Sequence, residues 1–592
     1  MRISSMWRQR SALPDRERPP GKRDGRHSDL SCTSIMNQLF GYQILPKDLS
    51  VSPVVVEGAL PVEIPLCPKT APRQLEVAAY PNTRLQTHYC PLTGALVYIW
   101  GIPVHPTVIQ SKIAAWSVGV ITEQRYDLFR DLLGPFVAII DEPKQQRVTF
   151  VADPLGVRPM FIGHSKDRMI FGSEVWPLLK AGLVNGDVDY DAVSAWLAYR
   201  YNCTDGSLFS ELHRLPAGAV SVFQNGRFKT IPYIQWESSD DHPTEEQAVE
   251  NLHRIISSTT GILLKDQPRV ALALSGGYDS RYLLALASAV VKQPIECTTV
   301  AVTEQEDAVA RQVAETVGAA HKRIPCRGSE WDLYENVFHA APDGFPLSKN
   351  LTYLVAQVDP GTPMLHGFMG DGLIRGSKDT YLGKYETEWK EDLAGILQRK
   401  HLGISFDMLR GDIAKQVRER SLAPMEAAVR EGSRIGKIFG WADFYYRQRL
   451  YISNNFNQHL GLTEAVVPFY AWPLLKYKMA HDYRCFNRAV YKKIFERHFP
   501  ALSKIPHAGE LHKAGRSIPF SACAKTWARR LSVVMCDKNQ LTLLARKHCL
   551  PRLLAGMAGV GRVEVSVLTF QRLYWLEQQM RDARLDLDWE RI

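Results

Sequence analysis

The sequence predicts a protein that joins an antiparallel, strand-rich N-terminal half to a C-terminal half built on a parallel sheet. Between residue 36 and about residue 235, short apolar runs recur between turn signals, which is typical of antiparallel strands joined by hairpins. From about residue 245, helical periods alternate with single strands, which indicates βαβ units. A length of 592 residues allows two or more domains.

Composition excludes several classes of protein. Hydrophobic residues make up 45% and charged residues 23%, which is ordinary for a globular chain. No apolar run approaches the roughly 18 residues of a membrane span, so we expect no membrane insertion. The ten cysteines form no CxxC pair, which favours reduced thiols in a cytoplasmic protein over structural zinc. Nucleic-acid binding would need a concentrated basic face, which the sequence alone does not show, so we expect no nucleic-acid partner. The net charge of +10 suits an anionic or polyphosphate ligand.

The N-terminal half divides into a tail and a strand-rich domain. Residues 1–35 are rich in Arg, Pro, Gly and Ser without any period, and we expect a disordered basic tail. Residues 36–236 form the first predicted domain, with a helix at 191–199. Its predicted strands are short apolar runs at residues 95–100, 136–140, 148–152, 160–162, 169–171 and 220–223.

A polar, acidic linker at residues 237–250 separates the two halves and ends in a helix that begins near Thr244. The second predicted domain covers residues 245–525, followed by a helical extension at 526–592. Its predicted helices are residues 248–263, 280–291 and 307–317, and its predicted strands are 270–274, 297–302 and 322–324. Beyond about residue 385 the pattern is mostly helical.

The segment "LALSGGYDS" carries the clearest chemical signal. An apolar strand ends in three small residues, and a helix follows directly, so backbone N–H groups and the positive end of the helix dipole meet at one place. Such a loop can bind an anion. The alternative is a plain strand-to-helix turn capped by Asp279 or Ser280. Neither a Walker A sequence nor GxGxxG is present in this segment.

The hexapeptide SGGYDS resembles the pyrophosphate-binding loop of the ATP pyrophosphatase, or PP-loop, family. That resemblance implies cleavage of ATP between its α and β phosphates, with a carboxyl group activated as an adenylate. It also implies ATP and Mg²⁺ as cofactors. By the same resemblance Asp279 is a metal ligand, and the phosphates are bound by Ser275, Gly276, Gly277, Asp279 and Ser280.

Two further segments resemble the asparagine synthetase-like branch of that family. The segment "VTEQEDAVARQVAETVGAAH" resembles the next strand and helix, with Glu306, Asp307 and His321 in matching places, and Val302 would meet adenine. The segment "MLHGFMGDGLIRG" resembles the second phosphate loop of the family, LSGEGGDELFGG. The resemblance makes Gly367 and Gly370 phosphate-loop residues.

The second loop also supplies a metal ligand and departs from the family pattern. Asp371 matches the acidic position that would hold Mg²⁺ together with phosphate oxygens. A turn-capping role for Asp371 is the alternative. Phe368 and Gly372 replace the two glutamates of the family loop, which puts aspartate as substrate in doubt.

The segment "CFNRAVYKKIFERHFPALSKIP" resembles the basic helix that holds the adenylate in this family. Arg488 and Lys492 are the predicted catalytic cations, with Lys493 a weaker candidate. A solvated basic helix face is the alternative for any single residue.

The N-terminal half resembles the glutaminase-type domain of asparagine synthetases over residues 132–179 and 208–223. The resemblance implies an αββα sandwich of the N-terminal nucleophile hydrolases. Such a domain uses a cysteine directly after the initiator methionine. Here Arg2 follows the first methionine and Asn37 follows Met36, while the nearby Cys32 would need proteolytic exposure. We therefore expect a glutaminase-like domain without glutaminase activity.

These expectations leave three functions open. The first is an ATP-dependent cyclase of the lasso-peptide type, related to β-lactam synthetases, in which an amine of the substrate itself attacks the activated carboxyl. Its substrate would be a peptide or small-molecule carboxylate, with a protease or carrier from the same biosynthetic cluster as partner. The second is an asparagine synthetase-like amidotransferase acting on aspartate, another small molecule or a polysaccharide. The third is a catalytically inactive scaffold.

Overall fold

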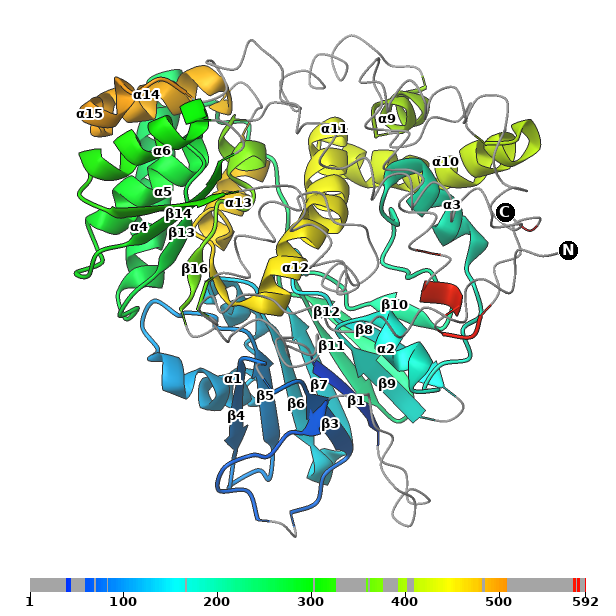
Figure 1. Ribbon diagram of the computed structural model, residues 1–592. Helices are drawn as coiled ribbons and strands as arrows, with labels where there is room; N and C mark the ends of the chain where they lie inside the picture. Colours follow the sequence, from blue (N-terminus) through cyan, green and yellow to red (C-terminus); the bar gives the residue numbers. More distant parts are fainter. Residues whose placement is uncertain are drawn as a thin grey trace, which may run out of the picture.

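The computed structural model describes most of the chain between residues 39 and 507. The described residues are 39–43, 59–165 except 69, 70 and 82, 168–325 except 302 and 303, 358–375 except 360 and 361, 392–401, 409–507 except 482–484, and a few positions between 576 and 591. Val302, the predicted tail 1–35 and nearly all of the predicted extension 526–592 lie outside them. Figure 1 shows a strand-rich N-terminal part below a second part built of helices and a parallel sheet.

The N-terminal part consists of two antiparallel sheets of six strands each. The first sheet runs, in spatial order, through β10 (Leu212–Arg214), β8 (Phe161–Ser165), β9 (Arg168–Gly172), β1 (Leu39–Gln43), β3 (Leu75–Ala79) and β2 (Leu60–Pro61). The second runs through β12 (Arg227–Pro232), β11 (Ala219–Gln224), β7 (Arg147–Ala152), β6 (Val137–Glu142), β5 (Leu96–Trp100) and β4 (Leu85–Tyr89).

Strand β5 shows why these sheets stack. Leu96 and Tyr98 point into the core shared with the first sheet, whereas Val97 and Ile99 point into a second core beneath helix α1 (Ile113–Thr122). On the other side of the sandwich, α2 (Val175–Lys180) packs on β9. The order is therefore helix, sheet, sheet, helix, which confirms the predicted αββα sandwich.

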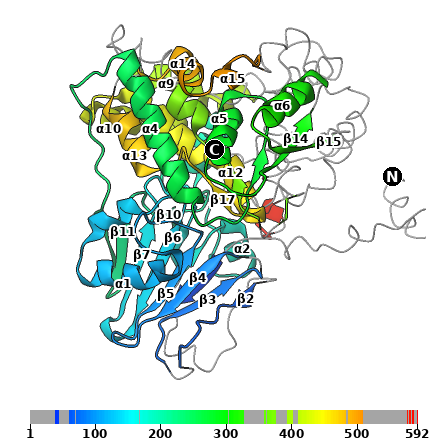
Figure 2. The ribbon, with the colours of Figure 1, turned by 90° about the vertical axis from the view of Figure 1, so that its left-hand side faces the viewer.

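The second part contains a five-stranded, all-parallel sheet. Its spatial order is β15 (Ala320–Pro325), β14 (Glu296–Ala301), β13 (Ala271–Ala273), β16 (Met364–Leu365) and β17 (Ala465–Val466). Figure 2 shows α4 (Glu245–Leu264), α5 (Tyr278–Ser288) and α6 (Glu304–Thr316) beside this sheet, with the sandwich below. Thr244 caps α4 in a reciprocal pair with Gln247, so the helix begins where the sequence predicts.

Most of the remaining elements are helical, as the sequence predicts beyond residue 385. They comprise α3 (Tyr190–Tyr199), α9 (Leu393–His401), α10 (Gly411–Arg434), α11 (Ile438–Trp441), α12 (Ser453–Leu462), α13 (Trp472–Ala480), α14 (Arg488–His498) and α15 (Pro500–Ser503), the π-helices Asp371–Arg375 and Ala442–Ile452, and the 3₁₀ turns Gln110–Lys112, Tyr126–Asp131 and Pro143–Gln145. No helix in the described part of the chain has both the length and the apolar character of a membrane span.

Candidate active site

The loop at residues 275–280 turns from β13 into α5 and is held by its own hydroxyl groups. The Ser275 N–H donates to Ser280 Oγ at 3.2 Å, and the Gly277 N–H lies 3.4 Å from Ser275 Oγ. Gly276 has a φ of +66°, a backbone conformation that favours glycine. Gly277 precedes α5 without any side-chain cap, so the helix begins with backbone N–H groups directed at the loop. This geometry suits an anion.

A buried arginine that the sequence analysis did not identify fixes the shape of this loop. The Arg281 side chain is 1% exposed, and its guanidinium donates to four backbone carbonyls at 2.7–3.1 Å. These carbonyls belong to Gly276, Leu502, Ile505 and Pro506. Because C=O and N–H point in opposite directions across a trans peptide, holding the Gly276 carbonyl directs the Gly277 N–H to the other side of the loop. The sequence signal for this role is a basic residue on the buried face of α5, where an apolar residue would be expected.

The second loop, residues 367–371, follows β16, which pairs with β13 directly. Leu272 of β13 lies opposite Leu365 of β16, although the two are far apart in the chain. Strand β14 pairs with the other edge of β13, so the strand order reverses between β13 and β16. Parallel α/β sheets bind ligands at the carboxyl ends of their strands at such a reversal. Both predicted phosphate loops leave the sheet at this point.

The two loops are in close contact through Asp279. A methyl group placed on Gly370 would lie 2.7 Å from Asp279 Cγ, and one on Gly367 would lie 3.4 Å from Asp279 Cβ. Asp371 is exposed at the start of the π-helix that follows. Asp279 and Asp371 thus supply a carboxylate from each loop.

The donor set at the two loops fits Mg²⁺ bound together with phosphate. Mg²⁺ is usually held by one or two carboxylates, waters and substrate phosphate oxygens. Within the described residues, no cluster of three or more His, Cys, Asp or Glu side chains could hold a metal by itself. The fit therefore depends on a phosphate ligand that brings further oxygens to Asp279 and Asp371.

Helix α14 closes the site from a third side with Tyr491. Burial raises the pKa of the Tyr491 hydroxyl, and the carboxylates of Asp279 and Asp371 raise it further. The fully buried Tyr491 is therefore a neutral phenol near these two carboxylates. The sequence pattern predicts a site role for basic residues of this helix but not for Tyr491, which lies between them.

The basic residues of α14 point in different directions. The Arg488 guanidinium lies 5.9 Å from the ring centre of Tyr278, the first residue of α5. Lys492 is 64% exposed and pairs with Glu496 one turn further along the helix, at 3.7 Å. Lys493 forms ion pairs with two glutamates of α4. The structure therefore brings Arg488 to the phosphate loop and leaves Lys492 on the outer face of the helix.

Phe368 and Gly372, the two positions that depart from the family pattern, both pack closely against neighbouring side chains. Phe368 is buried and stacks on Phe456 of α12, with ring centres 4.5 Å apart. Gly372 leaves room for the Gln448 side chain, because a methyl group on Gly372 would lie 2.9 Å from Gln448 Nε2. The described loop therefore carries one carboxylate, that of Asp371, where the family pattern has three.

A pair of neutral histidines supports the second loop from below. His366 Nδ1 accepts the N–H of Phe368 at 2.9 Å, and His366 Nε2 lies 3.0 Å from His459 Nδ1. Because Nδ1 of His366 is an acceptor, its proton is on Nε2 and is directed at His459. Burial lowers the pKa of His366 to about 4 and that of His459 well below its ordinary value.

His321, predicted from the family pattern, lies beside the end of β13. Thr299 donates its hydroxyl proton to the Leu274 carbonyl at 2.6 Å and accepts from His321 Nε2 at 2.9 Å. Burial lowers the pKa of His321, against an opposing effect of Asp307. This chain of hydrogen bonds joins three neighbouring strands, from the carboxyl end of β13 through the middle of β14 to the start of β15.

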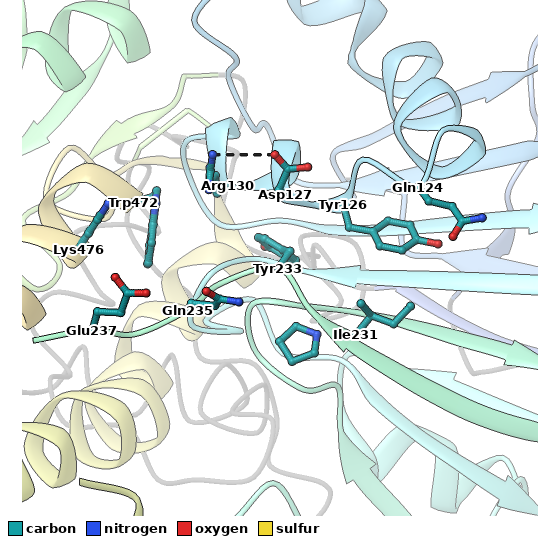
Figure 3. A pocket seen from close by; sticks show the side chains of 11 residues that line it. Gln124, Tyr126, Asp127, Arg130, Ile231, Tyr233, Gln235, Glu237, Trp472 and Lys476 are labelled. Carbon is teal, nitrogen blue, oxygen red and sulfur yellow. Dashed lines mark ion pairs between the residues drawn. The ribbon is translucent and has the colours of Figure 1, made fainter. Parts of the chain in front are cut away.

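A pocket of about 630 Å³ lies elsewhere, at the junction of the two halves of the chain. Figure 3 shows its lining side chains, with Arg130 and Asp127 forming an ion pair of 3.9 Å above Tyr233. Trp472 and Lys476 of α13 close it from the second half. None of the predicted site residues lines this pocket. The predicted nucleophile positions Arg2, Cys32 and Asn37 lie outside the described residues.

Comparisons with known proteins agree with the two-part organisation. A family model described as a glutamine amidotransferase domain matches residues 118–234, and one described as asparagine synthase matches residues 253–501. The chain is 21% identical over 308 residues to asparagine synthetase [glutamine-hydrolyzing] 1 of Bacillus subtilis. It is 27% identical over 169 residues to asparagine synthetase [glutamine-hydrolyzing] 3 of the same organism.

These matches are partial. They cover 50% and 28% of this chain, and they span 48% and 27% of the two relatives. Among solved structures, glutamine phosphoribosylpyrophosphate amidotransferase from B. subtilis is 10% identical with a TM-score of 0.22, covering 48% of this chain and 90% of that one. An allosteric regulatory enzyme of purine biosynthesis is also 10% identical, with a TM-score of 0.20, covering 43% of this chain and 66% of that one.

Proposed function

The chain belongs to the asparagine synthetase-like family, and on this premise we propose that it activates a carboxylate with ATP and joins it to an amine. One observation supports this most directly. The loop at residues 275–280 and the loop at 367–371 leave adjacent parallel strands at the reversal of strand order, and Asp279 contacts the second loop.

In the proposed reaction, backbone N–H groups and hydroxyls of the first loop bind the phosphates of ATP. Asp279 and Asp371 would hold Mg²⁺, which neutralises charge on the leaving pyrophosphate. The substrate carboxylate attacks the α-phosphorus, the bond to the β-phosphate oxygen breaks, and pyrophosphate leaves. An amine then attacks the acyl carbon and displaces AMP. Arg488, which lies beside Tyr278 of the first loop, would stabilise negative charge as either bond breaks.

The finer proposal is an intramolecular cyclase of the lasso-peptide type, acting in the cytoplasm on a peptide or small-molecule carboxylate. Its support is the replacement of the two glutamates of the family's second loop by Phe368 and Gly372. An amine within the same substrate needs no ammonia source, and proximity lowers the barrier to its attack. A protease or carrier from the same biosynthetic cluster would be the partner.

A second candidate is an asparagine synthetase-like amidotransferase, with glutamine or free ammonia as the nitrogen source. It is favoured by the glutamine amidotransferase model that matches residues 118–234. Aspartate, another small acid or a polysaccharide carboxylate would then be the substrate.

The deciding experiment measures AMP and pyrophosphate formed from Mg·ATP with each class of acid. Linear peptides with glycine at the start of the core and Asp or Glu seven or eight residues on test the cyclase, whose product loses one water. Aspartate with glutamine or with ammonium chloride tests the amidotransferase. Binding of Mg·ATP without AMP formation for any acid would contradict both candidates and leave the inactive scaffold.

A further inference from the structure

We propose that the N-terminal sandwich serves as a positioning platform for the second phosphate loop, through a buried turn at residues 153–158. This inference rests on the proposed function, because it concerns the same nucleotide site. The turn follows β7 and contacts three side chains from the second half of the chain. These side chains, Arg449, Glu464 and Tyr470, flank the loop at 367–371. The sandwich would thus contribute to the ligase reaction without chemistry of its own.

The first contact joins Asp153 to Tyr470. The fully buried Asp153 carboxylate accepts three backbone N–H groups at 2.9–3.2 Å from its own sandwich and the hydroxyl of Tyr470 from the other half. The same Tyr470 oxygen accepts the Leu155 N–H at 2.9 Å. The hydroxyl is therefore held from two directions by one turn.

Tyr470 transmits this position to the loop through its neighbours. Its ring centre lies 6.2 Å from that of Phe368 in the loop. The preceding residue, Phe469, has a ring carbon 2.9 Å from the position of a methyl group on Gly370. Gly370 itself lies against Asp279, so Phe469 and Asp279 enclose the loop from two sides. A shift of Tyr470 would therefore move Phe469 and Gly370 and displace the Asp279 carboxylate.

The second contact is the ion pair of Arg158 with Glu464, at 2.7 Å. Both side chains are buried, with 1% of the Arg158 side chain and 4% of the Glu464 side chain exposed. The Glu464 carbonyl accepts the N–H of Met364, the first residue of β16. The turn therefore also fixes the start of the strand that carries the loop, because a buried pair of charges tolerates little displacement.

The third contact reaches the far end of the loop. Arg449 is 1% exposed and donates to the Leu155 carbonyl and to Asp205 Oδ1, each at 2.6 Å. Its neighbour Gln448 fills the space beside Gly372. Gly156 of the turn adopts a φ of +57° with Arg449 Nη2 3.6 Å from its methyl position, so the turn conformation itself requires glycine. Rigid, fully hydrogen-bonded supports of this kind hold a site to the precision catalysis needs.

The test compares two tyrosine hydroxyls that cross the same interface. Tyr470→Phe removes the hydroxyl that reaches the turn, while Asp153 keeps its three N–H donors, so we expect the fold to be retained. Tyr199→Phe is the matched control, because its buried hydroxyl donates to the Ser421 carbonyl of α10 instead. Mg·ATP affinity is measured by isothermal titration calorimetry, and thermal stability by differential scanning calorimetry.

We expect both variants to lose similar thermal stability, and only Tyr470→Phe to lose Mg·ATP affinity, by about 10-fold or more. A second variant, Arg449→Lys, keeps the charge but replaces the Nε and Nη2 donors of the planar guanidinium by a single nitrogen, and it should also weaken binding. Unchanged affinity in Tyr470→Phe and Arg449→Lys, with wild type binding Mg·ATP, would overturn the platform alone. Absence of Mg·ATP binding by the wild type would overturn the proposed function, and the platform with it.

Discussion

The contact between Asp279 and Gly370 allows a sharp test of the site with one methyl group. In Gly370→Ala the new carbon would lie 2.7 Å from Asp279 Cγ and 2.9 Å from Phe469 Cε2. Carbon atoms pack at about 3.5–4.0 Å, so the methyl group must be accommodated on both sides by shifts of up to roughly 1 Å. Phe469 lies within the core, whereas Asp279 is only partly buried. We expect Asp279 to turn away from the metal position.

The size of the effect follows from that displacement. A misplacement of about 1 Å can cost about 10²-fold in an enzyme reaction, and overpacking costs about 1–3 kcal/mol of stability. Gly367→Ala is the matched control, because its methyl group would lie 3.4 Å from Asp279 Cβ, an ordinary contact. We expect Gly370→Ala to weaken Mg·ATP binding by about 10- to 100-fold and Gly367→Ala by less than about 3-fold.

The assay is calorimetric titration of wild type and both variants with Mg·ATP, without any acid substrate. Folding is checked separately by thermal unfolding in the absence of nucleotide. If the folded Gly370→Ala variant binds Mg·ATP as tightly as Gly367→Ala, Asp279 does not hold the metal in the way that we infer.

Three further predictions follow from the same site and its surroundings. Asp279→Asn and Asp371→Asn should each abolish Mg²⁺-dependent ATP binding while leaving the melting temperature within a few degrees, and retention of full binding by either would misplace the metal site. Glutamine alone, with or without ATP, should yield no steady release of ammonia in a coupled glutamate dehydrogenase assay; sustained release would show an active glutaminase domain. The neutral pair His366 and His459 should make stability depend on pH, because burial lowers the pKa of His366 to about 4 whereas unfolded histidine titrates near about 6.5. Stability is therefore complete above about pH 6.5 and falls towards pH 4 by up to ~1.4 kcal/mol per pH unit for each histidine, so urea unfolding at pH 7 and pH 5 should differ less in His459→Gln than in wild type.

Local patterns in the sequence were sufficient to predict the elements that carry the site. The strand at 271–273, the small residues after it and the helix from Tyr278 are all encoded within a few residues, because apolar runs, glycine and helix starts act locally. The same holds for the cap at Thr244 and for the short strands of the sandwich. The second loop was predicted from the family resemblance, because no local pattern indicates that residues 367–371 lie beside the first loop.

Only the tertiary structure decided which of these residues meet. The pairing of β13 with the distant strand β16, on the edge opposite β14, places Asp279 against Gly370, and such long-range pairing depends on the packing of the whole sheet. The phase of α14 decided that Tyr491 is buried near the carboxylates and Lys492 faces solvent, although the two are adjacent in the sequence. The partners of Arg281, four carbonyls mostly some 220 residues away, lie beyond any local signal, because they exist only once the chain has closed on itself.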